Sequence, residues 1–244
     1  MKASLYLFTD SYPFGYGESF LETEIKYLSQ QFEAIKIIPL EDYSRKSERS
    51  IPENAVVMAS LFGSHKNRGE IIIKGLFNFS PVLKHLKEFF NSKAYTSFKK
   101  LWLWGTFLLL TRAGIAYLKS NKILSSIKSS DICYFYWGLR WSQILPFLNE
   151  LNAGIIVRFH GSDVYENVNN DYMPMRASQL ENIDKAVFIS QCGYNYLTSR
   201  YAFIKKRSFV SRLGTLDHGK NPFLKDDTIK LVSCSNLVPV KRVA

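Results

Sequence analysis

The chain has 244 residues, of which 46% are hydrophobic and 22% charged, and its formal net charge is +11. This length and composition allow a substantial buried core and exclude a disordered or low-complexity protein. The three cysteines, Cys133, Cys192 and Cys234, share no metal-ligand spacing. They indicate buried thiols in a reducing cytoplasm. The apolar start, residues 1–8, is too short for a signal peptide.

Short apolar runs alternate with helical patterns along most of the chain. Ser19, with Glu22 three residues later, has the spacing of a capping box at the start of the first helix. Continuously apolar strands separated by helices are typical of a parallel sheet covered on both faces. We therefore predict an α/β fold, with a Rossmann-like parallel sheet and helices on both faces. Strands are expected at residues 4–8, 34–40, 55–59, 132–136, 155–159, 186–190 and 208–211, and helices from residue 19, within 69–127, and at 141–151, 175–182 and 193–201.

Around residues 212–227 this alternation gives way to Gly, Pro and charged residues, which is typical of a domain junction. We predict an N-terminal domain over residues 1–212, a linker over 213–228 and the first strand of a second domain within 229–244. Because a lone strand cannot form a domain, we expect this chain to be part of a longer protein.

The basic charge is concentrated in residues 66–128, where 12 Lys and Arg accompany two acids, Glu70 and Glu88, giving a local charge of +10. The segment predicts either two core-facing helices with solvated basic faces or an amphipathic surface on an anionic membrane. Nucleic acid is not expected, because no binding motif accompanies the charge. The most apolar run, 101–110, is too short to span a bilayer, and a longer run includes Arg112.

Ligands of open parallel sheets bind beyond the carboxyl ends of the strands, and the loop after the first strand holds Gly15, Gly17 and Glu18. The two glycines let the backbone approach a ligand closely, and the amides of the following helix attract anions. A dinucleotide fingerprint requires a third glycine where this chain has Phe20, so NAD binding is not expected. A simple turn is the alternative interpretation.

Aromatic residues end the fourth predicted strand, at Tyr136 and Trp137. Their faces suit the apolar face of a sugar or a lipid-linked acceptor, and ordinary packing explains them equally well.

Ionisable residues follow two later strands. Arg158, His160 and Asp163 lie at the end of a buried strand, which favours a functional role for the histidine over a structural one. Lys241 and Arg242 follow the last predicted strand, where cations would hold a diphosphate leaving group.

These segments, in their order and spacing, resemble glycosyltransferase family 4, and most closely its branch in bacterial capsule, exopolysaccharide and lipopolysaccharide gene clusters. The matching segments are FTDSYPFGYGESFLETEIKYL, YFYWG, VRFHGSDVYENVNNDYMPMR, FISQCGYNYL, SRLGT and SCSNLVPVKRV. The resemblance covers most of residues 4–64 and 131–244 but not the basic segment. It implies a GT-B fold, in which two Rossmann-like domains enclose the active site. It also implies transfer from a nucleotide sugar with retention of configuration, without a metal ion or other cofactor.

By motif position, the resemblance assigns a role to each residue. Gly15 and Gly17 would line the cleft near the diphosphate, and Glu18 would lie at its acceptor edge. His160 would contact the donor sugar at the reaction centre, with Asp163 just behind it.

The carboxyl end of the chain matches the family less completely. Lys241 matches the family's phosphate-binding lysine, but Asn236 stands where the family usually has an arginine. Either Arg242 supplies that charge instead, or this branch of the family uses one cation. The paired-glutamate donor motif of the second, donor-binding domain is absent from the chain. We therefore expect this chain alone to turn over no substrate.

The resemblance predicts a peripheral enzyme on the cytoplasmic face of the bacterial membrane. It would transfer a sugar from a nucleotide sugar to a lipid-linked or oligosaccharide acceptor in surface polysaccharide synthesis, and residues 66–128 would bind anionic lipid. Two alternatives are a non-catalytic glycan- or lipid-binding module of the same fold, and a GT-B sugar-nucleotide epimerase.

Overall fold

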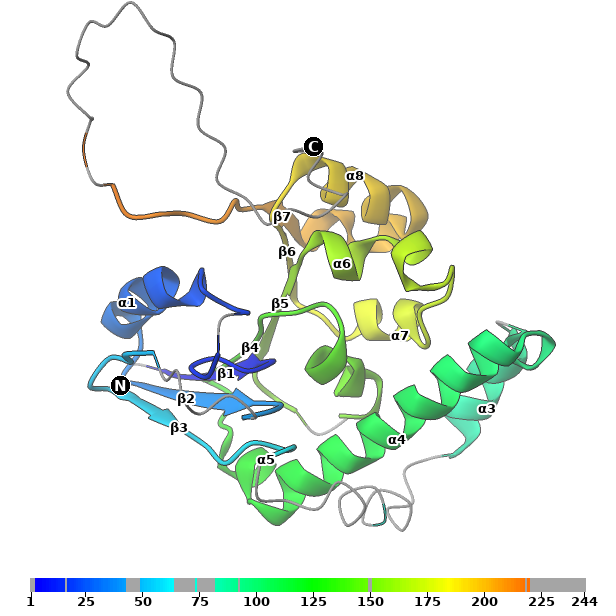
Figure 1. Ribbon diagram of the computed structural model, residues 1–244, viewed down its shortest axis with the longest axis horizontal. Coiled ribbons are helices and arrows are strands. Elements are labelled where there is room, and N and C mark those ends of the chain that lie inside the picture. The colour runs from blue at the N-terminus through cyan, green and yellow to red at the C-terminus, as the bar shows by residue number, and fades with distance from the viewer. Residues whose placement is uncertain are drawn as a thin grey trace, which may run out of the picture.

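The computed structural model describes residues 3–15, 17–42, 49–63, 73, 82–91, 93–148, 151–217 and 219. Seven strands form one sheet in the order β3-β2-β1-β4-β5-β6-β7, and every neighbouring pair is parallel (Figure 1). The strands are β1 (Ser4–Thr9), β2 (Ala34–Pro39), β3 (Ala55–Val57), β4 (Ile132–Phe135), β5 (Gly154–Phe159), β6 (Lys185–Phe188) and β7 (Ser208–Val210). The predicted α/β fold with a Rossmann-like parallel sheet is confirmed.

The strand order reverses beside β1. The chain runs outward from β1 to β3, crosses back to place β4 on the other side of β1, and then continues outward to β7. Phe8 of β1 is paired with Phe135 of β4, so the two strands end almost level. Their carboxyl ends therefore flank the topological switch point, the place where open α/β sheets bind ligands.

Helices cover both faces of the sheet, as predicted. On one face, Leu21 and Ile25 of α1 (Leu21–Gln31) pack with Leu7 and Ile37 of the sheet. On the other face, apolar side chains of several helices share one larger core with the sheet. These helices are α4 (Phe98–Ser120), α5 (Ile123–Ser126), η2 (Arg140–Phe147), α7 (Arg176–Glu181), α8 (Gln191–Arg200) and η4 (Ala202–Arg207). The other described helical elements are α3 (Val82–Asn91), η1 (Ala94–Thr96), α6 (Gly161–Val164) and η3 (Glu166–Asn169).

The seven strands lie within two residues of their predicted bounds, but two helix predictions need correction. The capping box of the first helix does not form: α1 begins after Phe20, with no side-chain cap. The Glu22 carboxylate instead forms an ion pair with Arg49, at 2.7 Å, and Arg49 is distant from it in the sequence. The helix predicted at 141–151 is a 3₁₀ helix that ends at Phe147, with Pro146 inside it.

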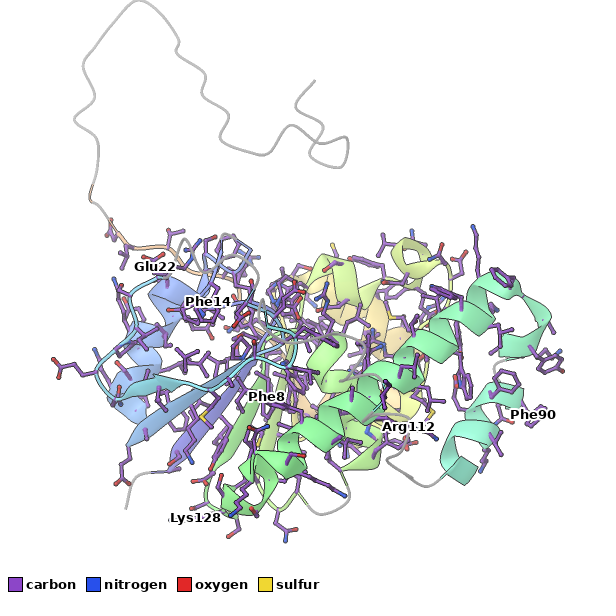
Figure 2. All side chains as sticks on the ribbon, turned by 60° about the horizontal axis from the view of Figure 1, so that its bottom comes forward. Phe8, Phe14, Glu22, Phe90, Arg112 and Lys128 are labelled. Atoms are coloured by element: carbon purple, nitrogen blue, oxygen red, sulfur yellow. The ribbon has the colours of Figure 1, made fainter. Side chains whose placement is uncertain are left out.

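The two ends of α4 lie in different surroundings. In its second half, Phe107, Ile115 and Leu118 belong to the core of the sheet. In its first half, Phe98 and Trp102 are exposed, and the hairpin of α3 and α4 projects from the body of the molecule (Figure 1). Figure 2 shows the α3 side chain that it labels, Phe90, at the outer end of this hairpin, and exposed there like the other two.

The 23-residue helix α4 is long and apolar enough to cross a membrane by length and composition alone. The burial of its second half in the sheet's core is the ordinary behaviour of a core helix. The most apolar run of the sequence, 101–110, lies within this helix, and so does Arg112, which the longer run includes.

The prediction of buried thiols is confirmed for Cys133 but wrong for Cys192, which lies at an exposed position of α8.

Several predicted features lie outside the described residues. These are the strand within 229–244, Cys234, Asn236, Lys241 and Arg242, and most of the basic segment before α3. The predicted linker is described at 213–217 and 219, and these residues form no helix or strand.

Candidate functional site

Three of the predicted ligand-binding segments meet at the switch point. They are the loop that follows β1, the end of β4 at Trp137, and the turn that begins at His160 after β5. The indole of Trp137 donates a hydrogen bond to Glu18 of the first segment, and its ring packs at a tilt against the His160 ring of the third. The fourth predicted place, Lys241 and Arg242, lies outside the described residues.

Glu18 fixes the loop after β1. Its carboxylate is buried and accepts four hydrogen bonds, from the backbone N–H groups of Asp10 (3.0 Å), Ser11 (2.7 Å) and Tyr12 (2.6 Å) and from the indole N–H of Trp137 (2.7 Å). Both oxygens are therefore engaged by the protein. Glu18 lies in the site where the sequence predicted it, and these contacts make it a residue that positions the loop and the indole.

The imidazole of His160 is held between two aromatic side chains. Its centroid lies 4.2 Å from the Trp137 ring and 5.1 Å from the Tyr136 ring, and its Nε2 is 3.1 Å from the Tyr136 carbonyl oxygen. A neutral ring donates to that carbonyl from Nε2 and so carries its lone pair on Nδ1. Burial, together with nearby Arg158, lowers the pKa of His160 to about 4, so the ring is neutral at physiological pH.

Asp163 joins the ends of β4 and β5. It is 1% exposed, and its carboxylate accepts the backbone N–H groups of Gly138 (2.7 Å) and His160 (2.5 Å). Burial raises the pKa of Asp163 to about 7, against these donors and Arg176, which lower it. Arg176 of α7 donates to the backbone carbonyls of Asp163 (2.6 Å) and Gly138 (3.0 Å). The Asp163 carboxylate through N–H groups, and Arg176 through carbonyl groups, thus both connect the segments that follow β4 and β5.

A cluster of charged residues beside the site was not predicted from the sequence. Arg140, in a left-handed conformation with φ of 57°, lies 3.4 Å from Asp10 and 3.7 Å from Glu41. The pKa of Asp10 is raised to about 7, mainly by burial and also by the nearby acids Glu18, Glu41 and Asp163, while Arg140 opposes the rise. Asp10 comes directly after β1 and Glu41 two residues after β2, so the rule that polar residues at strand ends mark a site would have found them.

The remaining predicted residues have different surroundings. Gly15 has a φ of 71°, which favours glycine, and its carbonyl accepts a hydrogen bond from Arg49. Gly17 lies in open space, since an added Cβ would meet only Ser11 Oγ at 3.8 Å.

Arg158 makes its contacts on the α1 face of the sheet. It is buried there and donates to the Tyr134 hydroxyl (2.6 Å) and to Glu24 of α1 (2.9 Å). Its neighbours in β5, Val157 and Phe159, belong to the core of the opposite face, as strand alternation requires. The guanidinium predicted to bind substrate is thus engaged by the protein itself.

Within the described part of the chain, no group of three His, Cys, Asp or Glu side chains is placed to hold a metal ion.

Comparison with known proteins gives a likeness in structure but none in sequence. No protein-family model and no curated protein matches the chain. Among solved structures, UDP-N-acetylglucosamine 2-epimerase from Rickettsia bellii is similar at a TM-score of 0.49 and 9% identity, over 87% of this chain and 45% of that one. The apo structure of OtsA is similar at a TM-score of 0.49 and 12% identity, over 87% of this chain and 49% of that one. The chain thus spans about half the length of each.

Gly138 and Gly161 offer a matched test of the packing at the site. A Cβ at Gly138 would lie 2.4 Å from a ring carbon of Phe159 and 3.2 Å from Asp163 Cγ, whereas one at Gly161 meets nothing within 4 Å. We expect Gly138→Ala to lower the free energy of unfolding by about 2 kcal/mol or more. Gly161→Ala should change it by less than about 0.5 kcal/mol. Chemical denaturation measures both values, and equal effects would contradict this account.

The neutrality of His160 predicts an unusual titration. Its ring resonances, assigned by their loss in His160→Asn, should titrate near pH 4 in NMR spectra rather than near 6.5. Because the unfolded chain takes up this proton near pH 6.5, the His160 contribution makes the folded state less stable as the pH falls from 6.5 towards 4. A midpoint near 6.5 in the folded protein would show that the ring is solvated.

Proposed function

We propose that this chain is the acceptor-side half of a glycosyltransferase with a GT-B fold, of the family 4 type that the sequence resembles. The observation that carries the proposal is the buried, neutral His160 packed against Trp137, with ring centroids 4.2 Å apart, at the switch point of a parallel sheet. A second observation supports the proposal: three of the segments that carry the resemblance meet at this switch point. The whole protein would transfer a sugar from a nucleotide sugar, with retention of configuration and without a metal ion.

A neutral imidazole suits this chemistry. Positive charge develops on the donor sugar as the diphosphate leaves, and an imidazolium beside it would oppose that charge. A neutral ring contributes hydrogen bonding without this repulsion. The face of Trp137 offers the apolar surface on which sugar rings pack. In this proposal Lys241 and Arg242 neutralise the departing diphosphate.

The acceptor in this proposal is a lipid-linked or oligosaccharide glycan in bacterial surface polysaccharide synthesis, at the cytoplasmic face of the membrane. A sugar-nucleotide epimerase and a non-catalytic glycan-binding module of the same fold are the competing functions. They are separable by product: an epimerase converts the nucleotide sugar with no acceptor present, and a binding module consumes none.

The exposed tip of the α3–α4 hairpin supports membrane contact in this proposal. Phe90, Phe98 and Trp102 are 61%, 82% and 66% exposed, and exposed Lys93 and Lys99 lie beside them. Aromatic side chains flanked by lysines are typical of surfaces that rest in the headgroup region of anionic bilayers. The same side chains on a helix that only covered the core would be buried.

The transferase proposal is tested with the product of the complete gene. With a nucleotide-sugar panel and a glycan acceptor, His160→Ala should lower kcat by about 100-fold or more, because a contact at the developing charge is lost. Cys192→Ala, an exposed change on α8, should leave kcat unchanged. A melting temperature within a few degrees of the parent shows that the variant is folded. A folded His160→Ala protein with full activity would exclude this role.

Membrane contact is tested by sedimentation with vesicles. We expect vesicles with anionic lipid, but not neutral ones, to retain the protein at low salt and to release it at high salt. Replacing Lys93 and Lys99 with Gln should weaken retention about 30-fold, since each lysine contributes about 1 kcal/mol at an anionic surface. The matched pair Lys205→Gln and Lys206→Gln in η4 should have little effect. Equal binding to neutral vesicles would refute the electrostatic contribution.

A further inference from the structure

A cavity lies next to the candidate site, on the side of Arg176. Its volume is about 530 Å³, within the range of about 300–1,000 Å³ typical of small-molecule pockets, and it lies between α3 and the segment from η3 to α7. Figure 1 shows α7 facing the α3–α4 hairpin across this region. The lining includes Glu88, Glu166, Asp171, Tyr172, Arg176 and Tyr201.

The charges around the cavity select against anions. Four acidic side chains and two basic ones line it, and Arg200, from outside the lining, pairs with Glu166, which leaves an excess of one negative charge. A phosphate or nucleotide diphosphate would meet repulsion there. The donor nucleotide of the proposed reaction is therefore a poor occupant.

The same groups suit a polyhydroxylated, uncharged ligand. The Tyr172 hydroxyl donates to both oxygens of Glu88, at 2.9 and 3.2 Å, and Arg200 pairs with Glu166 at 2.5 Å. These contacts fix the carboxylates while leaving lone pairs for hydroxyl donors. The rings of Tyr172 and Tyr201 add the aromatic surface on which sugar rings pack.

One side chain connects the cavity with the candidate site. Arg176 lines the cavity, is 3% exposed, and donates to the backbone carbonyls of Asp163 and Gly138. Its Nε has no hydrogen-bond partner among the described residues. A ligand in the cavity would therefore lie one side chain away from the turn that positions His160.

We propose that this cavity binds an uncharged sugar unit of the acceptor glycan, as a subsite separate from the reaction centre. This inference rests on the proposed glycosyltransferase function. It also accounts for the position of α3, which forms one wall of the cavity and part of the hairpin tip. A glycan carried on a lipid would then reach the cavity from the side of the hairpin.

Saturation-transfer NMR on this chain tests the subsite directly. The probes are the methyl glycosides of glucose, galactose, mannose and N-acetylglucosamine, with glucuronate and glucose 1-phosphate as anionic counterparts. We expect saturation transfer to at least one neutral glycoside and none to the anions. Ala177→Trp, which fills the cavity from α7, should reduce the signal at least fivefold. Ser199→Trp, which introduces the same side chain at an exposed position of α8, should leave the signal unchanged.

A milder variant guards against misfolding. Asp171 has a φ of 56°, a conformation that asparagine tolerates well, so Asp171→Asn removes one carboxylate with little strain. It should reduce the signal about threefold, and Cys192→Ala, an exposed change on α8, should leave it unchanged.

No signal from any neutral glycoside, equal signals from the Ala177→Trp and parent chains, or a stronger signal from glucuronate would each overturn the subsite. The proposed function is judged separately, by turnover of the complete gene product. A working transferase with no glycoside binding in this cavity would reject only the subsite.

Discussion

The buried carboxylate of Asp163 sets the spacing between the ends of β4 and β5. One oxygen accepts the N–H of Gly138 and the other the N–H of His160, so both backbones must stay within hydrogen-bond reach of one side chain. Only glycine fits at position 138, because the ring of Phe159 fills the space that a side chain would need. Losing the carboxylate would leave two buried N–H groups unpaired, which costs more than the bonds themselves contribute.

Glu18 has the corresponding role on the β1 side of the switch point. It gathers three backbone N–H groups of one loop and the indole of Trp137. The adjacent rings of Trp137 and His160 are therefore fixed from both sides, by the buried acid Glu18 in the segment after β1 and by Asp163 in α6, after β5. This enclosure also explains the low pKa of His160, since burial is its largest cause. Rigid placement and neutrality thus have a common origin.

Most of the fold and part of the site could be predicted from the sequence. Buried parallel strands are continuous apolar runs, and the polar residues that follow them, such as His160 and Asp163, mark the ligand edge. The Arg140 cluster was missed because it joins residues from three separate segments. Arg158, also predicted for the site, is engaged by Tyr134 and Glu24, and these contacts could not be predicted because both partners are distant in the sequence. The capping box was predicted from local spacing, but Glu22 pairs with Arg49, 27 residues away in the sequence.

The hairpin and the site are joined through packing. One half of α4 is fixed in the core of the sheet, so the exposed half and α3 keep a set position relative to the switch point. From α3, Glu88 contacts Tyr172, and four residues later Arg176 holds the backbone of Gly138 and Asp163. Every step in this chain is a direct contact or a short segment of backbone. Few and mostly buried groups therefore connect the hairpin tip with the turn of His160. This physical connection makes an acceptor approaching from the hairpin consistent with a reaction centre at the switch point.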